Sequence, residues 1–562
     1  MKTDALLSLT QFAVTFQQKE NAKQVIRDVS FDVFPNEILA IVGESGSGKS
    51  VTALAIIDLL PKHITKRTGS ITFKNLDLLH LDEQSMQSIR GNQISMIFQE
   101  PMSSLNPSLT CGYQVLEILR QHTASTHTQA KQEVLTLFEK VKLPRPEQLF
   151  NAYPHELSGG QKQRVMIAMA IACKPEILIA DEPTTALDVT VQQEILQLLK
   201  ELQQETGMSI IFISHDLSLV RELADRVLVM YQGEVVENAF AKALFHNPQH
   251  DYTKALLSAR PSMNVRLKQL PTISDFLTKT HKNSEETEAE RELRNQEIYS
   301  KPPLLQVNNI EKTYWTAGGI FKKPEAIQAV NGVSFKLYKG ETLGLVGESG
   351  CGKSTLGNAI LQLEPATSGT IFYRGNDITS LRRSELRLLR KEVQIIFQDP
   401  FASLNPRLTI GEAIAEPMTV HKLYNNTAER KEKVLELLDR VGLEASHYNR
   451  YPHEFSGGQR QRIGIARTIA VNPKLIICDE SVSALDISVQ AQVLNLLNEL
   501  KAHYGFTYIF ISHDLAVVKY MADQLIVMKA GKIEEMGEAD TIYADPKSPY
   551  TQQLIKAIPK GV

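Results

Sequence analysis

The sequence predicts an α/β fold built as two tandem domains, and three observations predict it. The chain has 562 residues, more than one hydrophobic core usually organises. A glycine-rich stretch, GESGSGKS at 43–50, returns as GESGCGKS at 347–354. In both halves short apolar runs end in polar groups, which is typical of buried parallel strands. We therefore expect each half to form an α/β core around its own phosphate-binding loop.

Three further motifs occur once in each half and in the same order. They are LSGGQKQR (157–164) and FSGGQRQR (455–462), ADEPTTALD (180–188) and CDESVSALD (478–486), and IFISHDL (211–217 and 509–515). Their offset is a constant 298 residues, whereas the glycine-rich loops lie 304 apart. A fixed order with one small length change indicates a duplicated domain. We place the domains at residues 1–261 and 304–562.

Residues 262–303 separate the two repeats. The apolar periodicity fades there into HKNSEETEAERELRNQE, with seven basic and seven acidic residues over the whole stretch. We expect a polar, solvated linker. The balanced charge argues against a basic arm that binds nucleic acid.

Composition and charge exclude several classes of protein. The formal net charge is −3 and the pI is about 6.6, so no overall attraction to nucleic acid or anionic lipid is expected. Asp4 interrupts any export signal, and the longest apolar run, 165–173, is far shorter than the roughly 20 residues that cross a bilayer. Widely spaced cysteines indicate reduced thiols of an intracellular protein: Cys111, Cys173, Cys351 and Cys478.

The polar groups that follow the predicted strands should meet at one site per half. These strands are expected within 37–42, 176–182 and 209–215, and within 341–346, 474–480 and 507–513. Carboxyl ends of parallel strands gather at one edge of a sheet, where ligands bind.

The glycine-rich loops predict two nucleotide sites. Glycines let consecutive backbone N–H groups point at phosphate oxygens, and the following helix adds its positive end. Lys49 and Lys353 should reach the β- and γ-phosphates. The expected ATP-binding residues of the loops are Gly43, Ser45, Gly46, Gly48, Lys49, Ser50 and Val51, and Gly347, Ser349, Gly350, Gly352, Lys353, Ser354 and Thr355.

Two consecutive acids end one strand in each half. We expect Asp181 and Asp479 to hold the water shell of Mg²⁺, and Glu182 and Glu480 to act as general bases on the attacking water. The alternative is that these acids only cap neighbouring helices.

A histidine and a glutamine complete each predicted site. His215 and His513 follow IFIS strands and could donate to the γ-phosphate or orient the water, although a lone histidine is more often structural. Gln99 and Gln398 could contact the metal or the water, or could be plain turn residues before proline. The expected magnesium ligands are Ser50, Gln99 and Asp181, and Ser354, Gln398 and Asp479.

The SGGQ motif opens a second helix N-terminus suited to an anion. With the motifs above, it makes nearly the whole chain outside 262–303 resemble the ATP-binding cassette (ABC) ATPases, whose signature is LSGGQ. The resemblance implies an antiparallel β subdomain and a helical subdomain in each half, the latter within about 100–157 and 399–455. It also implies that each ATP is capped by the signature of the other half: Ser158, Gly159, Gly160 and Gln161, and Ser456, Gly457, Gly458 and Gln459.

The same resemblance suggests further contacts. The family stacks adenine on an aromatic residue upstream of the loop, for which Tyr314 and Phe16 are the candidates; both could instead be aromatic residues that only pack their strands. Asp188 and Asp486 would lie at the interface between the cassettes.

The exact residues in and around these motifs are similar to those of the ATP-binding subunits of bacterial peptide and nickel importers. FQEP, FQDP and YPHE precede or accompany the repeated motifs, and segments 247–261 and 545–559 resemble the terminal HPYT element of that group. The fused arrangement looks most like the double ATPases of glutathione and microcin-type importers. The resemblance implies ATP and Mg²⁺, two inner-membrane permeases and a periplasmic solute-binding protein as partners, and a peripheral place on the cytoplasmic face of the inner membrane. Since the terminal elements lack cysteine, no iron–sulfur cluster is expected.

Three alternatives stay open at this point. The chain could be a twin-cassette ATPase that acts on ribosomes or nucleic acid, an exporter ATPase, or a regulatory pair without turnover. The retained glutamate and histidine in both halves favour two competent sites.

Overall fold

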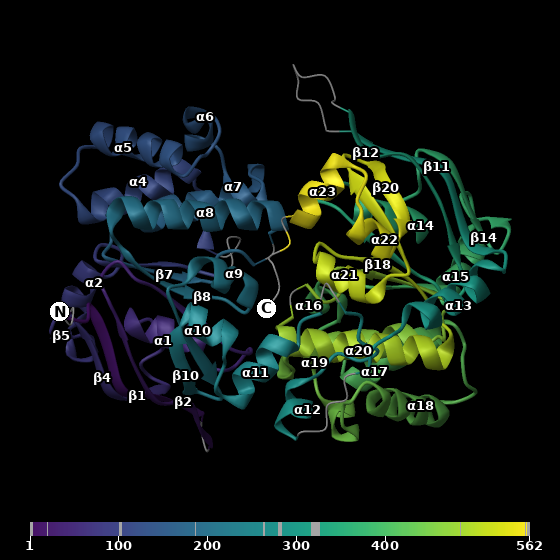
Figure 1. The fold of residues 1–562 in the computed structure, drawn as a ribbon, viewed down its shortest axis with the longest axis horizontal. Helices are drawn as coiled ribbons and strands as arrows, with labels where there is room; N and C mark the ends of the chain where they lie inside the picture. Colours follow the sequence, from purple (N-terminus) through teal and green to yellow (C-terminus); the bar gives the residue numbers. More distant parts are fainter. Residues whose placement is uncertain are drawn as a thin grey trace.

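The computed structural model describes residues 4–18, 21–99, 104–185, 187–261, 265–278, 284–315, 326–483, 485–556 and 558. The two halves have the same element order and the same strand order in every sheet (Figure 1). The predicted α/β class with two tandem domains is therefore confirmed.

A six-stranded, mostly parallel sheet forms the centre of each half. From one edge of the sheet to the other, the strands of the first half are β10 (Glu234–Phe240), β9 (Arg226–Tyr231), β3 (Ile38–Val42), β8 (Ser209–Ile213), β7 (Ile177–Asp181) and β6 (Ile94–Ile97). The second half has β20 (Lys532–Glu538), β19 (Gln524–Lys529), β13 (Thr342–Val346), β18 (Thr507–Ile511), β17 (Leu475–Asp479) and β16 (Val393–Ile396). The central strands β3 and β8 are buried at every residue, because helices cover one face of the sheet and the antiparallel sheet with the helix after the phosphate loop covers the other.

A four-stranded antiparallel sheet packs beside each central sheet, as the resemblance implied. Its strands are β2 (Asn21–Val33), β1 (Leu7–Gln18), β4 (Thr65–Phe73) and β5 (Leu76–Asp77), and β12 (Ala326–Tyr338), β11 (Pro303–Trp315), β14 (Ser368–Tyr373) and β15 (Asn376–Asp377). One apolar core joins this sheet to the phosphate-loop side of the central sheet in each half.

The helices of the first half are α1 (Lys49–Ile56), α2 (Glu83–Ile89), α4 (Cys111–His122), α5 (His127–Lys140), α6 (Pro146–Phe150), α7 (Gly159–Ile171), α8 (Val189–Thr206), α9 (Leu217–Leu223), α10 (Ala241–His246) and α11 (Asp251–Ser258). Those of the second are α14 (Lys353–Ile360), α15 (Arg383–Glu392), α16 (Pro400–Ser403), α17 (Ile410–Val420), α18 (Thr427–Arg440), α19 (Gly457–Ile469), α20 (Ile487–Tyr504), α21 (Leu515–Met521), α22 (Ala539–Ala544) and α23 (Pro549–Lys556). Helices α4 to α6 and α16 to α18 lie in the segments predicted to be helical subdomains.

The halves lie side by side in opposite orientations (Figure 1). Helices α4 to α8 form the upper part of the first half in that view, whereas α17 to α20 form the lower part of the second. Polar contacts cross the boundary twice in equivalent positions: the Ser488 hydroxyl donates to Glu44, and the Thr190 hydroxyl donates to Glu348 at 3.5 Å. In each contact the start of a helix of one half meets the phosphate loop of the other.

The described parts of the segment between the repeats, 265–278 and 284–303, contain regular structure, which differs from the expectation of a polar, solvated stretch. It contains α12 (Ile273–Leu277) and α13 (Glu288–Tyr299), and an isolated bridge pairs Leu267 with Glu285. Ile273 joins the core of the first half, and Leu270 joins the core of the second. The segment therefore packs against both domains.

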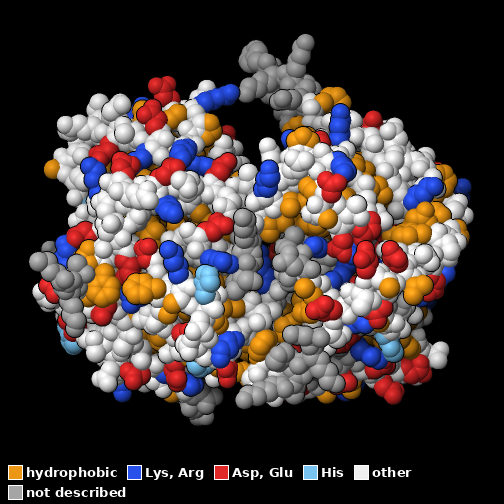
Figure 2. All heavy atoms as spheres, in the orientation of Figure 1, with side chains coloured by type: hydrophobic (Ala, Val, Ile, Leu, Met, Phe, Trp, Pro, Cys, Tyr) orange, Lys and Arg blue, Asp and Glu red, His pale blue; other side chains and the backbone are white. Residues whose placement is uncertain are grey.

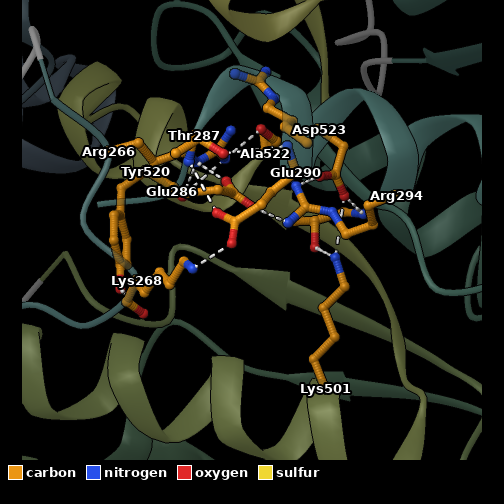
Figure 3. A network of polar contacts seen from close by, with 12 residues as sticks. Arg266, Lys268, Glu286, Thr287, Glu290, Arg294, Lys501, Tyr520, Ala522 and Asp523 are labelled. Carbon is orange, nitrogen blue, oxygen red and sulfur yellow. Dashed lines mark hydrogen bonds and ion pairs between the residues drawn. The ribbon is translucent and has the colours of Figure 1, made fainter. Parts of the chain in front are cut away.

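Ion pairs hold this segment against the second half (Figure 3). Asp523 is 1% exposed and receives Arg294 at 2.8 Å and Lys501 at 3.1 Å, while the Arg266 guanidinium donates to the Tyr520 and Ala522 carbonyls. Burial raises the pKa of the Asp523 carboxyl, but Lys501 and Arg294 lower it more, so the pKa is below its usual range. The sequence shows balanced charge here, but the partners lie more than 200 residues away, so their contacts are not visible in the segment itself.

The surface carries both signs of charge. Figure 2 shows basic and acidic side chains intermingled over the visible face of both halves, in agreement with the small net charge. In the part of the chain that the structure describes, no helix combines the length and the apolar character needed to cross a membrane.

Candidate nucleotide sites

The glycine-rich loops have the backbone that their sequence predicts. Gly43 and Gly48 adopt φ angles of 151° and 104°. A Cβ at Gly43 would lie 2.2 Å from the Met230 carbonyl oxygen, so glycine is required where the loop passes this neighbouring strand. The Lys49 ammonium donates to the carbonyls of Gly43 (2.7 Å) and Glu44 (2.9 Å), which places the charge inside the loop.

The second loop repeats this geometry. Lys353 donates to the carbonyls of Gly347 and Glu348 at 2.7 and 2.9 Å. Cys351 replaces Ser47 and is buried against Gly347. The glycines of the two loops keep φ angles within 1° of each other, so the loop backbone is the same with either residue.

A hydroxyl and a carboxylate lie together beside each lysine. The Ser50 hydroxyl donates to Asp181 at 3.2 Å, and the Ser354 hydroxyl donates to Asp479 at 3.0 Å. These are hard oxygen donors of the kind that Mg²⁺ prefers, so the residues fit that ion. Burial raises the pKa of Asp181 to about 6, and Ser50 only partly offsets this.

Glu182 is the most heavily contacted acid of the first site. Its Oε2 accepts hydrogen bonds from Gln99 Nε2 (2.9 Å) and Thr185 Oγ1 (3.0 Å) and lies 3.2 Å from His215 Nδ1. Its φ of 48° is left-handed, a strained conformation for a residue with a side chain. Strain of this kind concentrates at functional positions.

Glu480 occupies the equivalent position with one difference. Gln398 donates to its Oε2 at 2.8 Å and His513 Nδ1 lies 3.3 Å away, at a backbone φ of 46°. Ser483, which replaces Thr185, donates to the Glu480 backbone carbonyl instead of the carboxylate. The two sites are therefore similar but not identical.

Electrostatics stabilise the glutamate as a carboxylate and the histidine as a cation. Burial raises the pKa of Glu182, but His215 and Lys49 lower it more, to about 2. Burial lowers the pKa of His215, whereas Glu182 raises it to a net value above the usual one. The same directions hold for Glu480 and His513.

The signature motifs begin helices α7 and α19. Ser158 and Ser456 are N-caps whose hydroxyl oxygens accept the N–H of Gln161 (3.3 Å) and Gln459 (3.4 Å). Both serines are exposed, and a hydroxyl that accepts in a cap can still donate.

A cavity of about 200 Å³ joins the second loop to the first half. Lys353, Ser354, Gln398, Glu480 and His513 line it from one side. Leu187 and Asp188 line it from the other side, and none of the described residues around it belongs to the 158–161 signature. The structure thus brings Asp188, but not Ser158, to this loop.

Two tyrosines missed by the sequence reasoning support the loops. Tyr252 is fully buried, and its hydroxyl oxygen accepts the Glu44 N–H at 3.0 Å; Tyr550 accepts the Glu348 N–H at 3.3 Å. Both belong to the HPYT-like elements, and their recurrence at the same place in two similar segments was a signal in the sequence.

The two candidate adenine contacts differ in surroundings. Tyr314 is 37% exposed, contacts Glu364 through its hydroxyl, and has Lys312 5.2 Å from its ring centroid. Phe16 is half-buried and packs on the apolar core of its half.

Two family profiles match this chain. "ABC transporter" matches residues 26–185 and 330–483, and "Oligopeptide/dipeptide transporter, C-terminal region" matches 236–286 and 535–561. The first covers more than half of the sequence, so the chain belongs to the ABC transporter family. It is an ATPase with two ABC cassettes in one polypeptide.

Named relatives place the chain more closely. It is 46% identical to the glutathione import ATP-binding protein GsiA of Salmonella typhimurium, over 99% of this chain and 89% of the relative. The GsiA protein of Escherichia coli O157:H7 gives the same identity and coverage. The resemblance to double ATPases of peptide importers is thereby confirmed.

Proposed function

We propose that this ATPase powers the import of glutathione or similar short peptides. The observation that carries the proposal is the 46% identity to glutathione import ATPases over nearly the full length, together with a peptide-transporter C-terminal region after each cassette. The proposed organisation is cassette 1 at 1–261, a connecting segment at 262–303 and cassette 2 at 304–562.

The proposed chemistry is hydrolysis of ATP at both loops. Glu182 and Glu480 accept a proton from the attacking water, while His215 and His513 orient the terminal phosphate. Gln99 and Gln398 change position when that phosphate leaves, because each donates a hydrogen bond to the base at its site. Ser50 with Asp181 and Ser354 with Asp479 would hold Mg²⁺, which neutralises phosphate charge when bound.

The proposal includes capping of each ATP by the opposite half. Ser456 to Gln459 would cover the nucleotide at Lys49, and Ser158 to Gln161 the nucleotide at Lys353. The inverted arrangement and the contacts from α8 and α20 to the opposite loops support it. A modest closing movement would bring the exposed serines to the phosphates. Tyr314 and Phe16 are the proposed adenine contacts.

The proposed partners are two inner-membrane permeases and a periplasmic solute-binding protein. The ATPase would lie on the cytoplasmic face of the membrane, and its two helical subdomains would each receive a short helix of one permease. No nucleic acid and no iron–sulfur cluster are part of this proposal.

Uptake by intact cells tests this function. A strain that lacks the gene and uses glutathione as sole sulfur source should regain growth and labelled-glutathione uptake with the wild-type gene, but not with Glu182→Gln/Glu480→Gln. Uptake equal to wild type in the deletion strain would contradict glutathione as cargo, and competition by di- and tripeptides would identify the preferred class.

A further inference from the structure

One arginine lies between the two histidine loops. Arg260 follows helix α11 and faces a small cavity of about 90 Å³ that both halves line. His215 and Asp216 line this cavity from the first half, and His513 and Asp514 line it from the second.

The arginine contacts a carboxylate of each half. Its Nη1 donates to Asp216 Oδ1 at 2.9 Å and also contacts the Ser218 hydroxyl, while its Nη2 lies 3.8 Å from Asp514 Oδ2. Among the described residues that line the cavity, Arg260 is the only lysine or arginine. It therefore offsets the repulsion between two aspartates that face each other across the domain boundary.

Each aspartate is rigidly linked to a histidine of an ATP site. Asp216 directly follows His215, and its carboxylate caps helix α9 by accepting the Ser218 N–H at 2.8 Å. Asp514 follows His513 and caps α21 in the same way through the Ala516 N–H at 2.9 Å. A displacement of either cap displaces the adjacent histidine.

The arrangement is asymmetric although the domains are repeats. Alignment of DYTKALLSARP (251–261) with PYTQQLIKAIP (549–559) puts Ile558 opposite Arg260, and Ile558 lines the same cavity. The two histidine loops therefore share one arginine, whereas an exact duplication would have given an arginine to each.

We propose that Arg260 is a positioning residue that ties the histidine loops of the two cassettes together and couples their ATP turnover. Its planar fork can hold both carboxylates while the cassettes are together, and separation of the halves breaks the Asp514 contact because, of the two, it is the one that crosses the domain boundary. Hydrolysis at one site thereby changes the position of the histidine at the other.

The test is ATP turnover of the purified full chain as a function of MgATP concentration. We expect a Hill coefficient above 1 for wild type. Arg260→Ile should lower kcat about three- to tenfold and bring the Hill coefficient to about 1, and Arg260→Lys should give an intermediate value because an ammonium lacks the fork. Lys254→Ala, which removes an exposed charge from the helix just before Arg260, is the matched control and should match wild type.

Relocation of the arginine distinguishes coupling from a merely structural role. Arg260→Ile/Ile558→Arg should recover at least half of the kcat and of the cooperativity, since the new side chain enters the same cavity from the other half. A wild-type Hill coefficient of 1, unchanged kinetics in Arg260→Ile, or no recovery in the relocated variant would each overturn the proposal. The inference rests on the proposed ATP sites. If the proposed sites are wrong, Glu182→Gln retains ATP turnover. If only the role of Arg260 is wrong, Glu182→Gln is still inactive.

Discussion

At the scale of single residues, the two strand-end glutamates gather the polar contacts of their sites. Glu182 accepts hydrogen bonds from a glutamine and a threonine on one oxygen that also faces a histidine, and Glu480 repeats the glutamine and histidine contacts. Both glutamates have a left-handed backbone directly after their strands. Each glutamate is thus held by donors from separate segments of its own half.

Removal of either base should stop most of the ATP turnover. We expect Glu182→Gln and Glu480→Gln each to lower kcat about 10²–10⁴-fold with little change in ATP affinity, because glutamine fills the same space but accepts no proton, and unhydrolysed ATP at that site keeps the cassettes closed over the other. Phosphate release and nucleotide binding measure the two quantities separately. Full turnover in either variant would show that the glutamate is not the base.

The pKa of a buried carboxyl gives a prediction for stability. Glu341 is 1% exposed and accepts hydrogen bonds from Tyr338 N–H (2.7 Å) and the Tyr299 hydroxyl (3.1 Å); burial raises its pKa to about 7. The folded pKa exceeds the unfolded value of 4.5, so folding takes up a proton at pH values between 4.5 and about 7. The stabilisation that comes from this proton uptake is lost as the pH rises through about 7.

Glu341→Gln should remove this dependence. The difference in the free energy of unfolding, variant minus wild type, should increase by roughly 1–3 kcal/mol from pH 5 to pH 8. Urea unfolding at both pH values measures this difference. All other titrating groups are shared and cancel in the difference. A difference that stays constant with pH would contradict the shifted pKa.

The sequence predicted which residues meet around each phosphate loop, but not their neighbours, and the roles of those residues stay predictions. Glycine, lysine and the paired acids carry local signals, since each follows a strand at a fixed spacing. Thr185 and Ser483 carry no such signal, and their different partners are visible only in the folded sites.

At the scale of elements, the HPYT-like helices connect the ends of the chain's repeats to the phosphate loops. Helix α11 supports the first loop through Tyr252 near its start and precedes Arg260 at its end, whereas α23 supports the second loop through Tyr550 alone. These helices therefore help to shape the nucleotide sites.

Loss of the tyrosine hydroxyl should weaken ATP binding. Tyr252→Phe leaves the half-buried Glu44 N–H without its acceptor, at a cost of about 1 kcal/mol, so we expect the KM for MgATP to rise about three- to tenfold with kcat nearly unchanged. Tyr231→Phe is the matched control because its ring packs on Tyr252, with the centroids 4.2 Å apart, while its hydroxyl oxygen accepts a hydrogen bond from Gln232, outside the loop. Equal KM values for both variants would contradict the loop-supporting role.

The connecting segment makes a second prediction at this scale. Asp523→Asn leaves Lys501 and Arg294 without a buried carboxylate and should destabilise the second half by about 3–5 kcal/mol. Arg294→Ala removes a side chain that is 39% exposed and should cost only about 1 kcal/mol or less. Urea unfolding compares the two; an Asp523→Asn variant as stable as wild type would show that the ion network does not fix the segment.

The fold of this segment could not be predicted from its own residues. Its arginines and glutamates resemble a solvated charge run, and their burial depends on Asp523 and the Tyr520 carbonyl from the second cassette. The equivalent first-half residue, Asp225, is exposed, so the segment covers only one of two related surfaces.

At the scale of the whole molecule, duplication places two cassettes in one chain in opposite orientations. The connecting segment packs on both, and contacts from α8 and α20 reach the opposite phosphate loops. Tethering raises the effective concentration of each cassette for the other, on the order of millimolar for a short flexible link and more for a docked one. Under the proposed function, ATP is the ligand that closes the pair.

The structure of Glu182→Gln/Glu480→Gln bound to MgATP is the most direct test of this account. The account predicts that the Ser456 hydroxyl lies within about 3 Å of the γ-phosphate held by Lys49, and the Ser158 hydroxyl within the same distance of the γ-phosphate held by Lys353. Each triphosphate would then be contacted from both halves. Two nucleotides contacted only by their own half, with both signature serines distant from any phosphate, would contradict it.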